Sequence, residues 1–303
     1  MTHRSGFVGL IGLPNAGKST LLNSALEQKI SIVSSKPQTT RNRILGVLNA
    51  DNLQVALVDT PGIHRPRGKM HNVMVQTAKD VIPDMDAICW VVDAAKLIHK
   101  KKVLEHDKLF SRGIKHIAGI VSKVDHLIIV LNKIDLIHKP LLLPMLQRFQ
   151  SELPQAHLLP VSAKNQSGIS QLLALFAKVL PEMPPMFPTE MVTDVSERFL
   201  VAERIREKVF RLTNQEVPYS VAVEVQAFKE LKNKIEIYAR IWVERDSQKG
   251  IIIGKGGSRL KEIGTQARQE IEQILGTRVY LDLIVSVRGQ WTNNPNRLRE
   301  LGF

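Results

Sequence analysis

The residues between positions 12 and 19 are of types that could hold a chain of phosphates. They read G-L-P-N-A-G-K-S, which fits the pattern G-x-x-x-x-G-K-[ST] without a mismatch. In such a turn, backbone N–H groups converge on phosphate oxygens, and the N-terminus of the following helix adds positive potential. Lys18 would reach the β- and γ-phosphates, and the hydroxyl of Ser19 would ligate Mg²⁺. The candidate ligands in this loop are Gly12, Leu13, Pro14, Asn15, Ala16, Gly17, Lys18 and Ser19.

A carboxylate follows the apolar run 53–58, in the sequence D-T-P-G. At the carboxyl end of a strand beside a phosphate loop, Asp59 could contact Mg²⁺ directly or through water, and the N–H of Gly62 could meet a γ-phosphate. A surface turn is the alternative for this tetrapeptide when it is taken alone. The candidate ligands here are Asp59, Thr60, Pro61, Gly62 and the next residue, Ile63.

A third polar segment, N-K-I-D, follows the apolar run 127–131. The carboxylate of Asp135 can accept two coplanar hydrogen bonds from guanine N1–H and the exocyclic amino group, a donor pair that adenine lacks, so this residue would select the base. A helix N-cap is the alternative for Asp135. The segment S-A-K after a further strand could add a backbone donor to guanine O6. The candidates are Asn132, Lys133, Asp135, Ser162, Ala163 and Lys164.

The segment Q-T-T-R at 38–41 lies between the first two motifs. A threonine hydroxyl here could bind Mg²⁺ only while a γ-phosphate is present, which would order the loop and make a switch. Thr39 and Thr40 both remain candidates, and Thr40 is favoured. The order of these motifs resembles the translation-factor-related GTPases. The predicted metal ligands are Ser19, Thr40 and Asp59 for Mg²⁺, and the predicted catalytic residues are Lys18, Thr40, Asp59 and Gly62.

Two positions bear on how the chemistry would run. Ile63 stands where Ras-like GTPases have a glutamine that positions water, and an isoleucine cannot orient water by hydrogen bonding. We therefore expect slow hydrolysis without an activator. In related GTPases with asparagine at the position of Asn15, the side-chain oxygen helps bind K⁺ near the phosphates, so the resemblance implies stimulation by K⁺. Bracing of the loop is the alternative role for Asn15.

Strand-like and helix-like runs that alternate along the first 180 residues must position these groups. Near-continuous apolar strands separated by helices predict an α/β domain with a mostly parallel sheet covered on both faces, which binds ligands beyond the carboxyl ends of its strands. Strands are expected at 7–11, 53–58, 87–92, 127–131 and 157–161. Helices are expected at 19–26, 73–81, 104–112, 142–151 and 169–179. Four prolines within 181–188 predict an extended linker over 181–190.

Residues 191–303 predict a smaller α+β domain. A helix at 196–212, strands at 219–227 and 234–243, helical sequence through 274 broken by Gly264, and a strand at 278–287 match the KH arrangement of bacterial proteins. The run I-I-I-G-K-G-G resembles the G-x-x-G loop with which KH domains clamp about four single-stranded nucleotides. The isoleucines could line a floor for bases or belong to the core. The candidate RNA contacts are Lys249, Ile252, Gly254, Lys255, Gly256, Gly257, Arg259 and Lys261.

Composition favours a polyanionic partner. The net charge is +13, with +9 in residues 1–190 and +4 in 191–303, so local clustering rather than net charge points to the second domain. The single cysteine, Cys89, excludes an intrachain disulfide. No apolar run approaches the ~18 residues of a membrane span, and the early first strand leaves no room for a signal peptide, so a cytoplasmic protein is expected.

The whole pattern resembles the Era-like GTPases, a bacterial family that joins a GTPase domain to a C-terminal KH domain. The resemblance rests on G-L-P-N-A-G-K-S, Q-T-T-R, D-T-P-G, N-K-I-D and the I-I-I-G-K-G-G loop. It implies GTP, GDP and Mg²⁺ as ligands and binding near the 3′ end of small-subunit ribosomal RNA. It also implies a part in maturation of the small ribosomal subunit and peripheral contact with the inner membrane. A monomer is expected. A tRNA-modifying GTPase, a P-loop kinase and a constitutive RNA-binding module with a vestigial nucleotide pocket are the alternatives.

Overall fold

The computed structural model describes residues 2–34, 36, 39–64, 68–99, 102–105, 109–213 and 217–301. The chain forms two compact units. The first comprises Met1–Ser31, Thr40–Pro66 and Met74–Asp194, and the second comprises Ile32–Thr39, Arg67–Val73 and Val195–Phe303. Two short segments from the N-terminal part of the chain therefore belong to the second unit.

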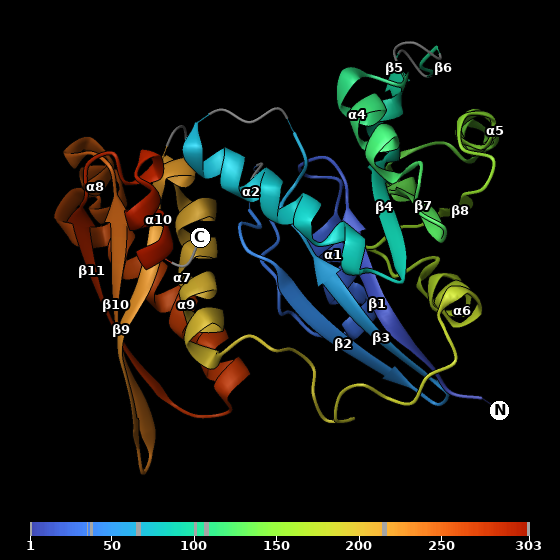
Figure 1. The fold of residues 1–303 in the computed structure, drawn as a ribbon. Coiled ribbons are helices and arrows are strands. Elements are labelled where there is room, and N and C mark those ends of the chain that lie inside the picture. Colours follow the sequence, from blue (N-terminus) through green and yellow to red (C-terminus); the bar gives the residue numbers. More distant parts are fainter. Residues whose placement is uncertain are drawn as a thin grey trace. The chain divides into compact units, whose positions relative to one another are not determined.

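The first unit is built on a six-stranded sheet in the order β2-β3-β1-β4-β7-β8 (Figure 1). All neighbours are parallel except β2 and β3, which form an antiparallel hairpin. The strands are β1 Arg4–Ile11, β2 Ile44–Ala50, β3 Leu53–Asp59, β4 Ala87–Asp93, β7 Leu127–Asn132 and β8 His157–Pro160. The five predicted strands are present. Strand β2 was not predicted, because a hairpin strand lies outside the strand–helix alternation on which the prediction depended.

Helices pack on the sheet through regularly spaced apolar residues. They are α1 Lys18–Leu26, α2 Lys69–Asp80, α4 Arg112–Val121, α5 Leu142–Glu152 and α6 Ile169–Val179. The helix predicted at 104–112 lies partly outside the described residues: Leu109 is helical and its N–H donates to the carbonyl of Glu105 at 2.8 Å, but the predicted start at Leu104 is wrong. Leu104 instead continues the small hairpin of β5 Ile98–His99 and β6 Lys102–Val103, since its N–H donates to the carbonyl of Leu97. Helix α4 starts where the apolar spacing starts, with Ile114 and Ile117 buried.

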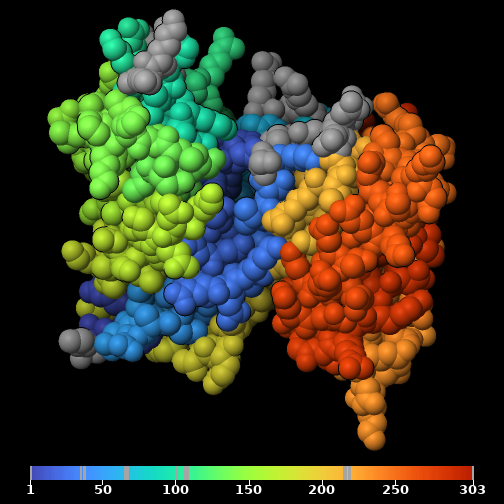
Figure 2. All heavy atoms as spheres, turned by 180° about the vertical axis from the view of Figure 1, so that it is seen from behind, coloured from blue at the N-terminus to red at the C-terminus, as the bar shows by residue number. Residues whose placement is uncertain are grey.

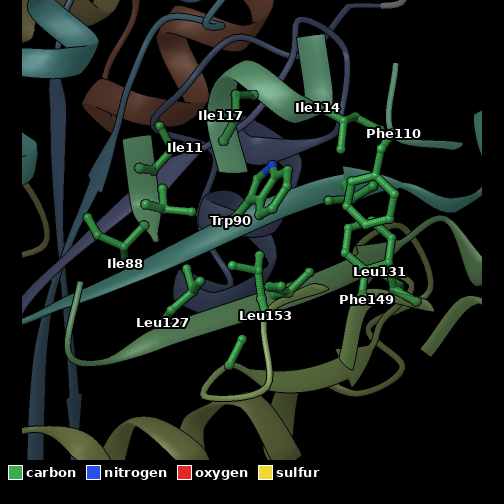
Figure 3. Packing of buried hydrophobic residues seen from close by; sticks show 14 of the residues in the cluster. Ile11, Ile88, Trp90, Phe110, Ile114, Ile117, Leu127, Leu131, Phe149 and Leu153 are labelled. Atoms are coloured by element: carbon green, nitrogen blue, oxygen red, sulfur yellow. The ribbon is translucent and has the colours of Figure 1, made fainter. Parts of the chain in front are cut away.

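The main core of the first unit lies between β4, β7 and helices α4 and α5 (Figure 3). The ring of Trp90 stands edge-on to Phe149, with centroids 5.8 Å apart, and both are fully buried. Ile114 and Ile117 reach the same cluster from α4. This packing fixes the strands whose carboxyl ends carry polar residues.

The proline-rich segment 181–190 contains no helix and no regular strand, and it packs along the first unit. The carbonyl of Pro181 accepts a hydrogen bond from the N–H of Ser5. The side-chain amide of the buried Gln54 donates to the carbonyl of Phe187 at 2.8 Å and accepts from its N–H at 2.9 Å. Proline limits regular structure, but the remaining backbone groups still find partners on the sheet.

The second unit has the predicted order of helix, two strands, two helices and strand. Its elements are α7 Glu197–Leu212, β9 Ala222–Leu231, β10 Lys234–Val243, α8 Asp246–Ile253, α9 Ser258–Leu275, β11 Val279–Val287 and the further helix α10 Pro295–Glu300. The sheet order is β11-β10-β9, with β10 parallel to β11 and antiparallel to β9. Helices α7 and α9 lie side by side on one face (Figure 1).

Helix α9 passes through Gly264 without a break, so the predicted interruption is wrong. A glycine inside a helix costs only about 1 kcal/mol relative to alanine. Buried Ile263, Ala267 and Ile271, on one face of the same helix, outweigh that cost. Within the described residues, no helix is both long and apolar enough to cross a membrane.

Candidate nucleotide and nucleic-acid sites

The polar motifs of the first unit meet at one edge of its sheet. Strand β1 leads into Gly12, β3 ends at Asp59, β4 ends at Asp93 and β7 ends at Asn132. Because these strands are parallel, their carboxyl ends lie at the same edge. This is the edge at which open α/β sheets bind ligands.

The phosphate loop is packed so closely that two positions admit only glycine. A Cβ on Gly17, whose φ is 100°, would lie 2.2 Å from the side-chain nitrogen of Asn132. A Cβ on Gly12 would lie 2.3 Å from the carbonyl oxygen of Val91. The loop therefore rests on the strands directly, and its backbone N–H groups stay close to the helix N-terminus that follows.

Lys18 is the buried cation of this loop. Its ammonium donates to the carbonyls of Gly12 and Leu13, both at 3.3 Å. Burial lowers its pKa to about 8, against the opposing attraction of Asp59. A phosphate group would supply the negative charge that this ammonium lacks, which fits the predicted role of Lys18.

Three hydroxyl groups converge on one carboxylate oxygen of Asp59. Oδ2 accepts from Ser19 at 2.6 Å, from Ser31 at 2.9 Å and from Thr40 at 3.4 Å. The hydroxyls of Ser19 and Thr40 are themselves 2.7 Å apart. The other oxygen, Oδ1, is buried and has no hydrogen-bond partner within the described part of the chain. We call Ser19, Thr40 and Asp59 the magnesium corner.

The magnesium corner fits Mg²⁺ by its chemistry. Mg²⁺ takes oxygen ligands and is held in phosphate sites by one or two carboxylates with substrate phosphates. Ser19 and Thr40 would ligate it, and Asp59, whose Oδ1 is unpaired, would hold it directly or through water. Burial raises the pKa of Asp59, while the charge of Lys18 and the three hydroxyl donors lower it.

Sequence reasoning missed Ser31, which is fully buried beside Asp59. The side chain of Asn23 positions it, since Asn23 Oδ1 accepts from the N–H groups of Ile30 and Ser31 and its amide donates to the Ser31 carbonyl at 2.8 Å. No motif marks these residues. An asparagine on the helix after the phosphate loop was the only signal.

The hydroxyls of the two threonines of the Q-T-T-R segment have different hydrogen-bond partners. The hydroxyl of Thr40 lies in the magnesium corner, 2.7 Å from that of Ser19, whereas the hydroxyl of Thr39 donates to the carbonyl of Lys36 at 2.9 Å. The chain passes between its two units at the Thr39–Thr40 bond. Within the second unit, the carbonyl of Thr39 accepts from Arg206 on α7 at 2.6 Å. The predicted neighbour Gln38 lies outside the described residues.

The D-T-P-G segment lies against the phosphate loop. The hydroxyl of Thr60 donates to the carbonyl of Leu10 at 2.8 Å, and a Cβ on Gly62 would lie 2.7 Å from the nitrogen of Pro14. The N–H of Ile63 donates to the carbonyl of Gly12 at 3.0 Å, while its side chain is buried in the main core. Ile63 therefore braces the loop through its backbone, a correction to its predicted place among the nucleotide ligands.

Asn132 ties the base-recognition segments to the phosphate loop. Its amide donates to the carbonyl of Ala16, and its side-chain oxygen accepts from the N–H of Ala163, both at 3.0 Å. The ammonium of Lys133 donates to the carbonyl of Asn15 at 2.7 Å and pairs with Asp93 at 2.6 Å. Sequence reasoning missed Asp93, although its position at the end of β4 could have indicated it.

The carboxylate of Asp135 accepts a hydrogen bond from a residue of the next motif. The hydroxyl of Ser162 donates to Asp135 Oδ1 at 2.6 Å, and Asp135 stays exposed at the edge of the site. Ser162 thus orients the carboxylate, in addition to the predicted backbone role of this segment. Lys164 is exposed beside it.

The second unit carries a groove at its glycine-rich turn. Gly254, Gly256 and Gly257 all have positive φ, between 57° and 77°, which glycine adopts without strain. The groove is lined by Gly257, Leu260, Lys261, Gly264, Thr265, Arg268, Leu281 and Leu283. Gly257 and Lys261 were predicted. The others follow from the i, i+3, i+4 spacing along α9 and from the facing strand β11.

The remaining predicted RNA contacts fall into different surroundings. Lys255 is exposed at the turn, and Lys249 is half-buried on α8. The guanidinium of Arg259 donates to the carbonyl of Ile251 at 2.7 Å, which braces the turn. Ile252 is fully buried in the core of this unit, so its predicted contact with RNA is corrected to a packing role.

Two family descriptions match the two units. The family described as 50S ribosome-binding GTPase matches residues 7–133, and the KH domain family matches residues 216–292. A GTPase Era of Syntrophus aciditrophicus is 49% identical over 302 residues, which cover 99% of this chain and 95% of the relative. One of a Geobacter species is 48% identical over 99% of this chain and 98% of its own.

The chain belongs to the Era family of GTPases. A crystal structure of Era in complex with MgGDPNP and nucleotides 1506–1542 of 16S ribosomal RNA matches it with a TM-score of 0.93 at 39% identity over 99% of both chains. Aquifex aeolicus Era bound to GDP·AlF4⁻, as a variant, matches with a TM-score of 0.89, 39% identity and the same coverage. The expected Era-like fold is confirmed, and the protein is a GTPase that binds GTP and GDP with Mg²⁺.

Proposed function

We propose that this chain is a GTP-hydrolysing switch that binds the 3′ region of small-subunit ribosomal RNA and assists biogenesis of the small ribosomal subunit. One observation supports the switch: the hydroxyl of Thr40 lies in the magnesium corner, while the carbonyl of the preceding residue, Thr39, accepts a hydrogen bond from Arg206 of the KH-containing unit. Full-length likeness to Era, one structure of which contains a 16S ribosomal RNA segment, supports the choice of RNA.

The nucleotide site would work by position and charge. Lys18 and the loop N–H groups would bind the β- and γ-phosphates, and the N–H of Gly62 would meet the γ-phosphate. Mg²⁺ held by Ser19, Thr40 and Asp59 would neutralise charge that develops on the transferring phosphoryl group. The buried side chain of Ile63 offers nothing to orient water, so we expect slow hydrolysis without an activator.

Coupling to RNA would run through the segment 32–39. Its contacts lie in the second unit: besides the Arg206 bond, Lys36 donates to the carbonyls of Phe210 and Thr213 at the end of α7, and Arg211 donates to the carbonyl of Val33 at 3.3 Å. Ligation of Thr40 in the triphosphate state would bias this segment, and the RNA-binding unit with it.

A titration of RNA affinity in three nucleotide states tests the proposal. The probe is the single-stranded 3′ segment of small-subunit ribosomal RNA, measured with a non-hydrolysable GTP analogue, with GDP and without nucleotide. We expect the affinities to differ between the GTP-analogue and GDP states by about 5-fold or more, the range of typical coupling free energies. Equal affinities in all three states would refute coupling, and no RNA binding in any state would refute the function.

The proposal also includes the binding of K⁺ at Asn15. Asn15 adopts a positive φ of 61°, and its carbonyl accepts a hydrogen bond from Lys133 at 2.7 Å, which supports a fixed conformation of this residue in the proposed phosphate loop. We expect faster hydrolysis in KCl than in NaCl at equal ionic strength, and loss of the difference in Asn15→Ala. Equal rates in both salts would contradict the role.

The base-recognition site weighs against the kinase alternative. Asn132, Asp135 and Ser162 form one connected set that suits guanine, and a metabolic P-loop kinase has no need of it. The tRNA-modifying alternative lacks support from the single cysteine, which is buried in β4. A vestigial pocket would not preserve the magnesium corner.

Three expectations about the protein in the cell are part of the same proposal: a monomer, a cytoplasmic location and peripheral contact with the inner membrane. The charge of +13 supports attraction to anionic surfaces of either kind. Sedimentation of the pure protein and flotation with anionic vesicles test the first and the last of these.

A further inference from the structure

Both ends of the segment 32–39 meet at one carboxylate. The chain leaves the first unit after Ser31 and returns to it at Thr40. The hydroxyls of these two residues both donate to Oδ2 of Asp59. Asp59 therefore contacts the residue before the segment and the residue after it, and the two contacts differ in what supports them.

The backbone of Ser31 is fixed by Asn23 of helix α1. Asn23 Oδ1 accepts from the N–H groups of Ile30 at 3.0 Å and of Ser31 at 2.9 Å, and the Asn23 amide donates to the Ser31 carbonyl at 2.8 Å. Ile30 also packs on the first unit, since its Cδ1 would lie 3.0 Å from a Cβ placed on Gly46 of β2. These contacts are made by the protein alone, so we expect them in every nucleotide state.

Ser31 is buried although the chain just before it is exposed. Helix α1 lies on the face that Figure 2 shows, in the blue part of the chain, and residues 27–29, which follow it, are exposed. Ser31 is then fully buried. A buried hydroxyl costs free energy unless it has a hydrogen-bond partner. The partner of this hydroxyl is Asp59, at 2.9 Å, so the local fold brings Ser31 to the magnesium corner.

The contact of Thr40 is the longest of three on the same oxygen. Ser19 donates to Asp59 Oδ2 at 2.6 Å, Ser31 at 2.9 Å and Thr40 at 3.4 Å. One oxygen of an ionised carboxylate has about two lone-pair sites, so the third and most distant donor is held most weakly. Thr40 is thus the end of the segment that leaves Asp59 at the least cost, and Ser31 is the end that stays.

We propose that Ser31 is a positioning residue of the magnesium corner, which holds Asp59 Oδ2 in both the GDP and the GTP state, while Thr40 joins and leaves with the γ-phosphate. With Oδ2 held by serine hydroxyls, Oδ1 is the oxygen that remains for Mg²⁺, directly or through water. The inference rests on the proposed place of Mg²⁺ and adds to it a residue outside the motifs. If Ser31 only satisfied its own buried hydroxyl, the response to Mg²⁺ would not depend on it.

Removal of the Ser31 hydroxyl should change the response to Mg²⁺. Binding of fluorescent GDP and of a fluorescent non-hydrolysable GTP analogue to the full chain is measured in EDTA and at increasing Mg²⁺. In Ser31→Ala, we expect the Mg²⁺ concentration for half-maximal tightening to rise about tenfold or more for both nucleotides, the usual effect of losing a partner that orients a metal ligand. In EDTA the affinities should equal those of the unaltered chain, because Ser31 acts through Asp59.

Two further variants separate the fixed end from the variable end. Thr40→Ala should raise the Mg²⁺ requirement more for the GTP analogue than for GDP, whereas Ser31→Ala should raise both by the same factor. Ser24→Ala is the matched control, since it removes a hydroxyl from α1 that is buried and has no hydrogen-bond partner in the described part of the chain. It should change neither requirement. Ser31→Cys, whose thiol is a weak donor, replaces Ser31→Ala if that variant is unstable.

The outcomes distinguish this inference from the proposed site. If Mg²⁺ does not tighten nucleotide binding to the unaltered chain, the magnesium corner is refuted, and the role of Ser31 with it. If Ser31→Ala responds to Mg²⁺ as the unaltered chain does, or loses as much affinity in EDTA as in Mg²⁺, the inference alone is overturned. A larger factor for the GTP analogue than for GDP in Ser31→Ala would show that this end is not fixed. Thermal unfolding without nucleotide verifies that each variant is folded.

Discussion

At the scale of single residues, burial sets the chemistry of the nucleotide site. Lys18 and Asp59 are both buried, and burial works against both charges, lowering the pKa of the lysine and raising that of the aspartate. In the proposed complex each meets an opposite charge, Lys18 in the phosphates and Asp59 in Mg²⁺. Because the burial of these two charges destabilises the free protein, we expect bound nucleotide and Mg²⁺ to stabilise the fold.

The pKa of Lys18 predicts how GTP affinity depends on pH. With a pKa of about 8 in the free protein, Lys18 is charged below that pH and must take up a proton on binding above it. We expect a constant Kd below about pH 7 and a Kd about tenfold weaker at about pH 9, measured by nucleotide fluorescence. Lys18→Arg, which stays charged, binds more weakly but without this loss, and ionisation of guanine affects both proteins alike. A flat profile for the unaltered chain would contradict the prediction.

Asp135 predicts the choice of base. In Asp135→Asn, the carboxamide can no longer accept from both guanine donors, and its amino group can donate to the 2-oxo group of xanthine. We expect GTP affinity to fall by at least about 100-fold and affinity for xanthosine triphosphate to rise, since each hydrogen bond to a charged group contributes about 1.5–3 kcal/mol. Ser162→Ala is the control: it loosens Asp135 but keeps the preference for guanine. Unchanged GTP affinity would instead support a vestigial pocket.

At the scale of elements, helix α7 does more than cover the KH sheet. Its apolar residues Ile205 and Val209 face the core, while Arg206 is held by both oxygens of Glu203, at 2.7 and 2.6 Å, and donates to Thr39. One helix thus packs in the core of the second unit and also binds Thr39, the residue before the proposed magnesium ligand Thr40.

Removal of the hydrogen bond from Arg206 to Thr39 should weaken binding of a GTP analogue and leave GDP binding unchanged. In Arg206→Gln/Glu203→Gln, where both charges are removed together, we expect GDP affinity to stay unchanged and the affinity for a GTP analogue to fall about five- to tenfold, or about 1 kcal/mol. Isothermal titration in both nucleotides measures this. Arg198→Gln removes an exposed arginine from the same helix and should change neither affinity. Equal losses for both nucleotides would mean that the contact serves stability alone.

At the scale of the whole molecule, each unit has a core of its own, around Trp90 in the first and around Ile237 and Ile263 in the second. Two cores predict two unfolding transitions, which ligands should shift separately. GDP with Mg²⁺ at about 100 times its Kd should stabilise the first unit by about 2.7 kcal/mol.

Tryptophan placement makes that prediction measurable. Trp90→Phe removes the one tryptophan of the first unit and leaves Trp242 and Trp291 as reporters of the second. We expect the fluorescence transition of this variant to stay in place on addition of GDP and Mg²⁺, while the calorimetric peak of the first unit moves to higher temperature. A single transition that shifts as one would contradict independent cores.

The sequence predicted those elements of the fold whose apolar residues recur at the spacing of a helix or a strand. Five strands, most helices and the order of the KH elements followed from this spacing. The helix predicted at 104–112 was started too early, because Leu104 pairs with Leu97 in a short local hairpin that has no clear periodicity. Gly264 was misread as a break because local propensity was weighed without the packing of α9.

The sequence by itself located the phosphate-loop pattern, the Asp59 and Asp135 carboxylates and the glycine-rich turn as candidate ligands, because these motifs have fixed spacing and a local backbone geometry. Only the tertiary structure decided that Ser31 joins Asp59, that Ile63 and Ile252 belong to cores, and that segment 32–39 belongs with α7. Each of these depends on contacts between residues distant in sequence, which no local pattern encodes.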